Sequence, residues 1–380
     1  MKDISKTFPS NLLCFSHLRW DFVYQRPQHL LSRFSKYSTV YVLEEPIFDA
    51  EDDGHISFTN RGNNIIVGVP HLPEGLSHEE VNASMTDLVD QFLQGKNLDN
   101  FAFWYYSPMF LAISEKHTPK LTIYDCMDEL SAFKNAPKEL TQMEKRLLRK
   151  ADVVFTGGQS LYEAKKHQHP NIHPFPSSIE KEHFQKARTV KNQPADQAGI
   201  EGVKLGFYGV LDERFDIDLI KGIADARPEW QIILIGPIVK IDPATLPKNS
   251  NIHYMGQKSY QELPAYLSGW DIALIPFAIN ESTKFISPTK TPEYLSAGIP
   301  VVSTPIKDVI NPYGRHKLVS IGMNAEDFIE AIDQELKKTD RTAWLAKTDL
   351  FLADKSWDNT VSNMMQLMNR HLNSNFSIAS

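Results

Sequence analysis

The sequence predicts an α/β protein of two domains, each built on a doubly wound parallel sheet. A chain of 380 residues exceeds what one ordinary core holds, and 42% hydrophobic with 23% charged residues is typical of a globular protein. Short apolar runs also alternate with amphipathic ones. Strands separated by helices pair in parallel through right-handed crossovers. The net charge of −7 argues against a protein that coats nucleic acid.

The first half of the chain contains the first alternating series. Apolar runs of strand length occupy residues 11–16, 40–43, 65–69, 101–106, 121–124 and 153–156. Apolar residues at helical spacing occupy residues 25–37, 79–93 and 139–151. Residues 186–203 are polar, contain proline and two glycines, and are predicted to link the domains. We therefore expect a first Rossmann-like domain over residues 1–190.

A second alternating series follows this polar stretch. Strands are expected at residues 205–211, 231–235, 252–255, 272–276, 301–303 and 318–321, and helices at 217–226, 260–267 and 325–337. We expect a second Rossmann-like domain over residues 200–340 and mostly helical structure over 344–372. Ligands of such sheets bind outside the carboxyl ends of the strands. Two such sheets in one chain would therefore have a ligand-binding cleft between their carboxyl edges.

Residues 287–304, SPTKTPEYLSAGIPVVST, predict a loop, a short helix and a buried strand. Pro292 suits the first helical turn, and Gly298 suits the carboxyl-terminal cap. The amino terminus of a helix attracts phosphate, and Lys290 would add a full charge there. The carboxylate of Glu293 could accept hydrogen bonds from ribose hydroxyls. The alternative is an ordinary surface helix with a Lys290–Glu293 ion pair.

The run EYLSAGIPVVST resembles the signature of retaining glycosyltransferases of the two-Rossmann (GT-B) class, family 4-like or group 1. The resemblance implies transfer of a sugar from a nucleotide-diphosphate sugar, with a UDP-sugar as the expected donor, and assigns donor-ribose binding to Glu293. The family often has another Glu eight positions earlier, where this chain has Phe285, so the donor sugar and the anomeric outcome stay open. The other expected donor-binding residues are Gly209, Arg214, Gly236, Ser287, Thr289 and Lys290.

Arg214 follows the strand expected at 205–211. The resemblance implies that Arg214 and Lys290 bind the diphosphate of the donor. Its planar guanidinium suits phosphate oxygens, whereas the alternative is a surface pair with Asp216 or Asp218. Gly209 near the strand end would let a donor approach the backbone. Because Asp216 and Asp218 begin a helix and are expected to cap it, no Asp-x-Asp dyad is placed as a metal site, and we expect no metal cofactor.

Residues 16–31, SHLRWDFVYQRPQHLL, resemble a segment of bacterial glycosyltransferases of surface polysaccharide assembly. The resemblance suggests acceptor binding by Arg19, Trp20 and Arg26, with Trp20 stacked on a sugar and the arginines near an anionic acceptor or the donor phosphates. The alternative is helix capping and core packing, above all for Gln25 and Gln28.

Asp128 follows the strand expected at 121–124 and is a candidate general base, or in a retaining reaction a group that orients the acceptor. His17 is the rival base. For Asp128 the alternative is a loop cap, and Asp125 is expected to be structural. In the resembling family the last helix crosses back to the first domain, so residues 341–380 are expected there, anchored by Trp357 through packing.

The leading hypothesis is therefore a glycosyltransferase acting on a saccharide or lipid-linked acceptor in polysaccharide or cell-surface glycan synthesis. A nucleotide-sugar epimerase of the same fold and an inactive nucleotide- or sugar-binding protein are the alternatives. A dinucleotide oxidoreductase is disfavoured because no Gly-x-Gly-x-x-Gly follows a strand. The acceptor and the oligomeric state stay open.

The location expected from the sequence is the cytoplasm. The start, MKDISKTFPS, has no signal-peptide core, and no run of about 18 apolar residues occurs. Cys14 and Cys126 lie in or beside apolar runs and are expected to be buried thiols in a reducing compartment. Peripheral contact with the inner face of the membrane is compatible with this expectation.

Overall fold

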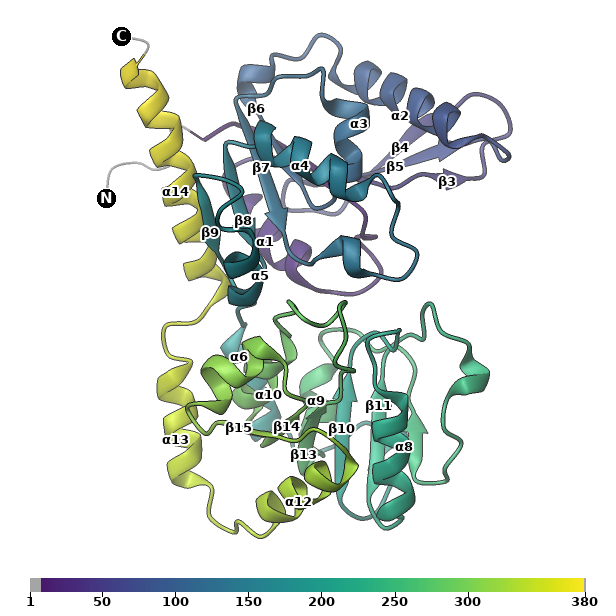
Figure 1. The fold of residues 1–380 in the computed structure, drawn as a ribbon, viewed down its shortest axis with the longest axis vertical. Helices are drawn as coiled ribbons and strands as arrows, with labels where there is room; N and C mark the ends of the chain where they lie inside the picture. Colours follow the sequence, from purple (N-terminus) through teal and green to yellow (C-terminus); the bar gives the residue numbers. More distant parts are fainter. Residues whose placement is uncertain (1–7, 379–380) are drawn as a thin grey trace. The chain divides into compact units, whose positions relative to one another are not determined.

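The computed structural model describes residues 8–378, and their side chains up to residue 374, and it divides the chain into two compact units (Figure 1). The first unit contains the chain up to Pro176 together with helix α14 (Trp357–Ile378). The second unit contains Ser177–Ser356. Each unit has its own sheet and its own hydrophobic core, as predicted for two α/β domains.

The sheet of the first unit has the strand order β3-β5-β2-β1-β6-β7-β8-β9, with β4 added beside β5. Only β4 is antiparallel to its neighbour among the described strands. Because the others are parallel, the loops after β1, β6 and β7 leave the same edge of the sheet. The strands are β1 (Asn11–Ser16), β2 (Thr39–Glu44), β3 (Ile47–Phe48), β4 (His55–Asn60), β5 (Ile65–Leu72), β6 (Phe101–Tyr105), β7 (Leu121–Cys126), β8 (Val153–Thr156) and β9 (Ile172–Pro174).

The helices of the first unit are α1 (Arg26–Phe34), α2 (His78–Leu93), α3 (Leu111–Ser114), α4 (Leu140–Lys150), α5 (Gln159–Lys165) and α14. Helix α14 packs on this unit, and Trp357 at its start is fully buried, with its ring stacked on His29 at 4.7 Å between centroids. Cys14 and Cys126 are buried free thiols, and burial raises the pKa of both.

The sheet of the second unit has the order β12-β11-β10-β13-β14-β15, and all these strands are parallel. The direction of winding reverses between β10 and β13, and open α/β sheets bind ligands at such a switch point. The strands are β10 (Lys204–Tyr208), β11 (Gln231–Ile235), β12 (Ile252–Tyr254), β13 (Ile272–Ile275), β14 (Val301–Ser303) and β15 (Val319–Ile321). The helices are α6 (Lys181–Gln185), α7 (Ala195–Ala198), α8 (Ile217–Ala226), α9 (Leu263–Leu267), α10 (Lys290–Ala297), α11 (Lys307–Val309), α12 (Ala325–Leu336) and α13 (Thr342–Phe351).

The domain boundaries differ from those expected. The chain passes between the units at Pro176 and Ser177, so residues 186–203 belong to the second unit and are not a linker. Their polarity was misleading because Gln197 is fully buried, where its amide donates to the carbonyl of Tyr266 and accepts from Nε1 of Trp270, both at 2.9 Å. Residues 341–356 also belong to the second unit, and only the chain from Trp357 onwards returns to the first.

Candidate functional site

Two glycines shape the carboxyl edge of the second sheet. Gly209 follows β10 and Gly236 follows β11. Both have a backbone φ of 142°, which residues with a side chain rarely adopt. A Cβ added to Gly236 would lie 1.9 Å from the carbonyl oxygen of Gly209. A Cβ added to Gly209 would lie 2.4 Å from Cε and 2.8 Å from Nζ of Lys290. Because glycine has no Cβ, the two turns can approach each other closely, and the Lys290 ammonium can lie against the end of β10.

Helix α10 begins at Lys290, has Pro292 in its first turn and ends at Gly298, whose φ is 82°, as predicted. Residues 291–297 are all buried, so the alternative of a surface helix is wrong. The Lys290 ammonium lies 5.6 Å from the ring centroid of Phe207 and 5.7 Å from that of Phe277. A cation beside aromatic rings and at a helix start is suited to an anionic ligand.

Glu293 is buried with only 4% of its surface exposed, and the hydroxyl of Tyr208 donates a hydrogen bond to it. Burial raises the pKa of Glu293 to about 7, against the Tyr208 hydrogen bond and the Lys290 charge, which both lower it. Glu180 raises this pKa further. The carboxyl group thus changes charge near neutral pH, and it would gain from further hydrogen-bond donors to its ionised form.

Tyr208 was not among the residues predicted for the site. It is the last residue of β10 and directly precedes Gly209, which was predicted. Its hydroxyl is buried, which raises its pKa well above the usual value, so it remains a hydrogen-bond donor at neutral pH. A tyrosine at the end of a buried strand was the available signal, but its partner lies 85 positions away in the sequence.

Arg214, predicted to bind the diphosphate, pairs with Asp212 and not with Asp216 or Asp218, which were its alternative partners. Its Nη2 lies 2.6 Å from Oδ2 of Asp212, and its Nε lies 3.0 and 3.1 Å from the two carboxylate oxygens. Asp216 instead caps α8 by accepting the backbone N–H of Leu219 at 2.9 Å, in agreement with its predicted capping role. The pair with buried Asp212 fixes the orientation of the guanidinium within the turn that follows β10.

Ser287 and Thr289 lie in the segment that leads into α10. The carbonyl of Ser287 accepts a hydrogen bond from the hydroxyl of Ser177 at 3.0 Å, and Thr289 directly precedes the helix. The structure therefore brings Gly209, Gly236, Lys290 and the start of α10 to one edge of the second sheet.

Arg26, which was predicted to bind the acceptor, lies in the interior of the first unit. It is buried in α1 and makes an ion pair with buried Asp125, with Nη2 at 2.7 Å and Nε at 3.0 Å from the carboxylate, while Nη1 donates to the carbonyl of Phe175 at 2.7 Å. Burial lowers the pKa of Arg26, but the charge and the hydrogen bond of Asp125, together with the charges of Tyr106 and Asp128, outweigh burial, and the net shift is upward. The pair joins α1 to β7, and acceptor binding by Arg26 stays a prediction.

The loop after β1 carries His17, Arg19 and Trp20 and is organised by Glu44 at the end of β2. Glu44 accepts the Trp20 backbone N–H at 2.6 Å and Nη1 of Arg19 at 3.0 Å. Arg19 also donates to the two backbone carbonyls that follow Glu44. Trp20 packs partly buried against the core of this unit, and His17 is half-buried. These contacts position the loop and leave acceptor binding by its residues a proposal.

Asp128 is half-buried in the loop after β7, at the edge of the first sheet where the loop after β1 also lies. The Cys126 thiol donates to its carbonyl at 3.6 Å. The next residue, Glu129, is held by the buried Lys165 ammonium at 2.8 Å, and Lys165 also contacts both carboxylate oxygens of Glu144, at 2.9 and 2.8 Å. The loop that carries Asp128 is thus tied to α5 and α4.

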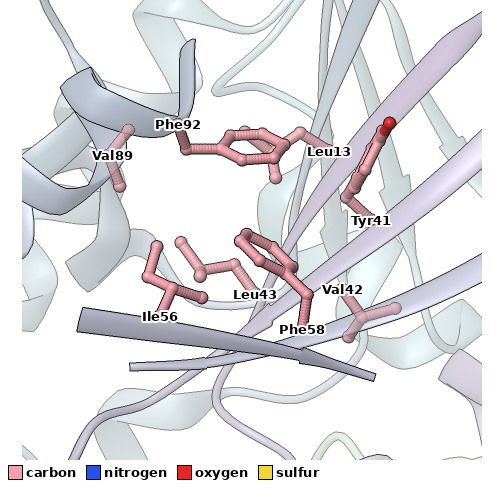
Figure 2. A pocket seen from close by; sticks show the side chains of 8 residues that line it. All are labelled: Leu13, Tyr41, Val42, Leu43, Ile56, Phe58, Val89 and Phe92. Atoms are coloured by element: carbon pink, nitrogen blue, oxygen red, sulfur yellow. The ribbon is translucent and has the colours of Figure 1, made fainter. Parts of the chain in front are cut away.

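The first unit also has a cavity between α2 and the sheet, with a volume of about 10 Å³ (Figure 2). Figure 2 shows mainly apolar side chains from strands and helix facing it, so it is suited to no polar substrate. Its lining residues are Leu13, Tyr41, Val42, Leu43, Ile56, Phe58, Val89 and Phe92. A hollow of about 420 Å³ at the end of α2 is lined by Asp90, Lys96, Lys116 and His117, among others. Neither contains a predicted site residue.

Between residues 8 and 378 no three His, Cys, Asp or Glu side chains are grouped so that they could hold a metal ion. In the same range no helix combines the length and the apolar composition needed to cross a membrane.

Two α/β units in one chain, each with a sheet of mainly parallel strands and its own core, are typical of the GT-B class of fold. Sucrose-phosphate synthase from Thermosynechococcus elongatus matches with a TM-score of 0.70 at 13% identity, over 98% of this chain and all of its own. The Anabaena protein HepE, in complex with UDP and glucose, matches with a TM-score of 0.66 at 13% identity, over 94% of this chain and 98% of its own. The predicted fold class is confirmed.

Residues 204–338 match the family model of the glycosyl transferases group 1, and this segment is a domain of that family. The chain is also similar to TuaH of Bacillus subtilis, whose name assigns it to teichuronic acid biosynthesis as a glycosyltransferase. The two are 26% identical over 239 residues, which cover 58% of this chain and 59% of TuaH. For residues 204–338, the family predicted from the EYLSAGIPVVST segment is confirmed.

Proposed function

We propose that this protein is a glycosyltransferase that moves a sugar from a nucleotide-diphosphate sugar, a UDP-sugar in particular, to a saccharide or lipid-linked acceptor. The single observation that carries the proposal is the position of Lys290 against Gly209, at the start of a buried helix and at the switch point of the second sheet. The group 1 family match supports the reaction class. HepE with bound UDP supports the nucleotide, and TuaH supports a role in surface glycans.

In this proposal the donor diphosphate is held without a metal ion. Its charge is met by the Lys290 ammonium, the Arg214 guanidinium and the N–H groups at the start of α10, as electrostatic stabilisation of the leaving group requires. Gly209 and Gly236 let the donor approach the backbone, and Ser287 and Thr289 line the segment before the helix. Glu293 accepts the ribose hydroxyls, whose hydrogen bonds favour its ionised form.

The first unit supplies the acceptor side in the same proposal. Asp128 or His17 takes the proton of the acceptor hydroxyl if the reaction inverts the anomeric centre. If it retains that centre, Asp128 orients the acceptor instead. Arg19 and Trp20 border the acceptor. Arg26 supports this face from the interior, through its pair with Asp125.

Calorimetry with UDP tests the donor site. Lys290→Ala and Glu293→Ala should each weaken UDP binding at least tenfold, which corresponds to about 1.4 kcal/mol. Lys284→Ala is the matched control, since Lys284 is exposed in the segment before α10 and pairs with Glu281. Unchanged affinity in both site variants, with folding intact, would remove the assignment. EDTA should leave turnover unchanged.

A second assay tests the reaction itself. The protein and a UDP-sugar are incubated with and without a saccharide acceptor pool, and release of UDP is followed. Acceptor-dependent release supports the transferase. Conversion of the nucleotide sugar to an epimer without an acceptor would identify an epimerase, and tight UDP binding without turnover in any pool would identify a binding protein. Asp128→Asn should abolish transfer and leave the Kd for UDP unchanged.

A further inference from the structure

Glu213 is an acidic side chain with an unusual environment in the turn between β10 and α8. Both carboxylate oxygens are shielded from solvent, although the residue as a whole is only half-buried. Among residues 8–378 no group donates a hydrogen bond to either oxygen. Its stem is therefore more exposed than its charged end, which is the reverse of what long charged side chains ordinarily do.

The other acidic groups of this turn have partners. Asp212 makes the ion pair with Arg214, and Asp216 caps α8. Burying a carboxylate without a donor is unfavourable, and groups in this state mark places where a ligand, ion or water completes the hydrogen bonding. A ligand that carries hydroxyl groups can supply the hydrogen-bond donors that both oxygens lack.

The turn lies on the edge where the donor is proposed to bind. The N–H of Leu211 donates to Pro237 after β11 at 2.9 Å. On the other side, the carbonyl of Arg214 accepts from Ala278 after β13 at 2.8 Å. The turn therefore spans the ends of the strands on both sides of β10, starting from Gly209 beside Lys290.

A site for a sugar needs acceptors for its hydroxyl groups. Phe285 in the segment before α10 is apolar and cannot accept a hydrogen bond through its side chain. Glu213, in the turn between β10 and α8, offers two carboxylate oxygens, each with unused acceptor capacity. Two neighbouring hydroxyls of a pyranose present two donors that match such a pair of oxygens.

We infer that Glu213 binds hydroxyl groups of the sugar that the donor carries, and so takes part in choosing that sugar. The inference rests on the proposed function, since it assumes a nucleotide sugar at the carboxyl edge of the second sheet. The ligand class is a neutral or acidic hexose linked to a nucleoside diphosphate. Free UDP has no such sugar and makes no contact with Glu213.

The test compares UDP with UDP-sugars on the full chain. Calorimetry gives the Kd of UDP, UDP-glucose, UDP-galactose, UDP-N-acetylglucosamine and UDP-glucuronate for the wild type and for Glu213→Gln and Glu213→Ala. Both variants should bind UDP within twofold of the wild type, and Glu213→Ala should bind the preferred UDP-sugar at least tenfold more weakly. Glu201→Gln, an exposed carboxylate of the same unit, is the matched control and should change neither Kd.

Folding is controlled by thermal melting of the free proteins. Glu213→Gln should melt at the same temperature as the wild type or higher, because it removes an unpaired buried charge. Unchanged UDP-sugar affinity in Glu213→Ala would overturn the inference. An equal loss of UDP and UDP-sugar affinity would overturn it too, by making Glu213 a support of the turn. If the wild type binds no UDP, the proposed function itself is overturned. The UDP titration of the wild type alone shows this, so the two failures can be told apart.

Discussion

Replacement of Glu293 by Gln should change how the stability of the second unit depends on pH. In the folded chain the pKa of Glu293 is about 7, because the carboxyl group is buried, and the ordinary value is 4.5. The folded state therefore holds a proton that the unfolded state releases. The associated stability is fully present below pH 4.5 and is lost as the pH rises through 7.

The size of the effect follows from the difference between these two pKa values. A pKa of about 7 in the folded chain, against 4.5 in the unfolded chain, corresponds to about 3 kcal/mol of unfolding free energy lost between pH 4.5 and 8. A glutamine has the shape of the protonated acid but does not ionise. The Glu293→Gln variant therefore lacks this part of the pH dependence of the unfolding free energy. Relative to the wild type, the variant should thus gain about 3 kcal/mol on going from pH 4.5 to pH 8.

Urea unfolding followed by tryptophan fluorescence measures this difference, since Trp230 and Trp270 are buried in the core of the second unit. The control is Glu281→Gln, an exposed carboxylate of the same unit, which should follow the wild type at every pH. Parallel pH curves for the wild type and Glu293→Gln would refute the reasoning, because they would mean that Glu293 titrates normally in the folded chain.

The same titration predicts a signature of ligand binding. If ribose hydroxyls donate to Glu293, they stabilise its ionised form and lower its pKa. UDP binding at pH 6.5 should then release a proton, which calorimetry in buffers of different ionisation enthalpy detects. The affinity should rise as the pH increases from 6 to 8. Proton uptake, or no exchange in the wild type, would contradict a ribose contact by this carboxylate.

Three further predictions concern stability. Arg26→Met leaves Asp125 buried and unpaired and should lower the free energy of unfolding in urea by about 3–5 kcal/mol. A double variant with Asp125→Leu should restore much of this loss. A loss below 1 kcal/mol would contradict the buried pair. Gly236→Ala, with its φ of 142° and a carbonyl oxygen of Gly209 in the space of the new Cβ, should cost at least about 1–3 kcal/mol and weaken UDP binding. Trp357→Ala should destabilise the first unit by about 3–5 kcal/mol without changing the Kd for UDP.

The sequence alone predicted the local elements and the family. The apolar runs predicted each of the central strands, because a buried parallel strand needs a nearly continuous apolar stretch. Pro292 and Gly298 predicted the two ends of α10 because their constraints on φ act on the residue itself. The edge strand β4 was not predicted, since its residues are mostly exposed and show no apolar run.

The tertiary structure decided which polar groups are used internally. Arg26 and Asp125 are 99 positions apart, and no local pattern indicates that their charges meet in the interior. Gln197 appeared to belong to a linker because its polarity is visible in the sequence and its buried partners are not. In the same way Tyr208 joins Glu293 only after β10 and α10 pack together, and that burial moves the pKa of Glu293.

Residue type and spacing therefore determined the two sheets, the family and the segment around Lys290, since these depend on hydrophobic periodicity and backbone constraints. Which charged groups are buried, paired or left for a ligand depended on contacts between distant segments. Burial and pairing set the energy of a charge, and both are properties of the packed chain. That is why the pairing of Arg26 and the environment of Glu213 became visible only in the folded protein.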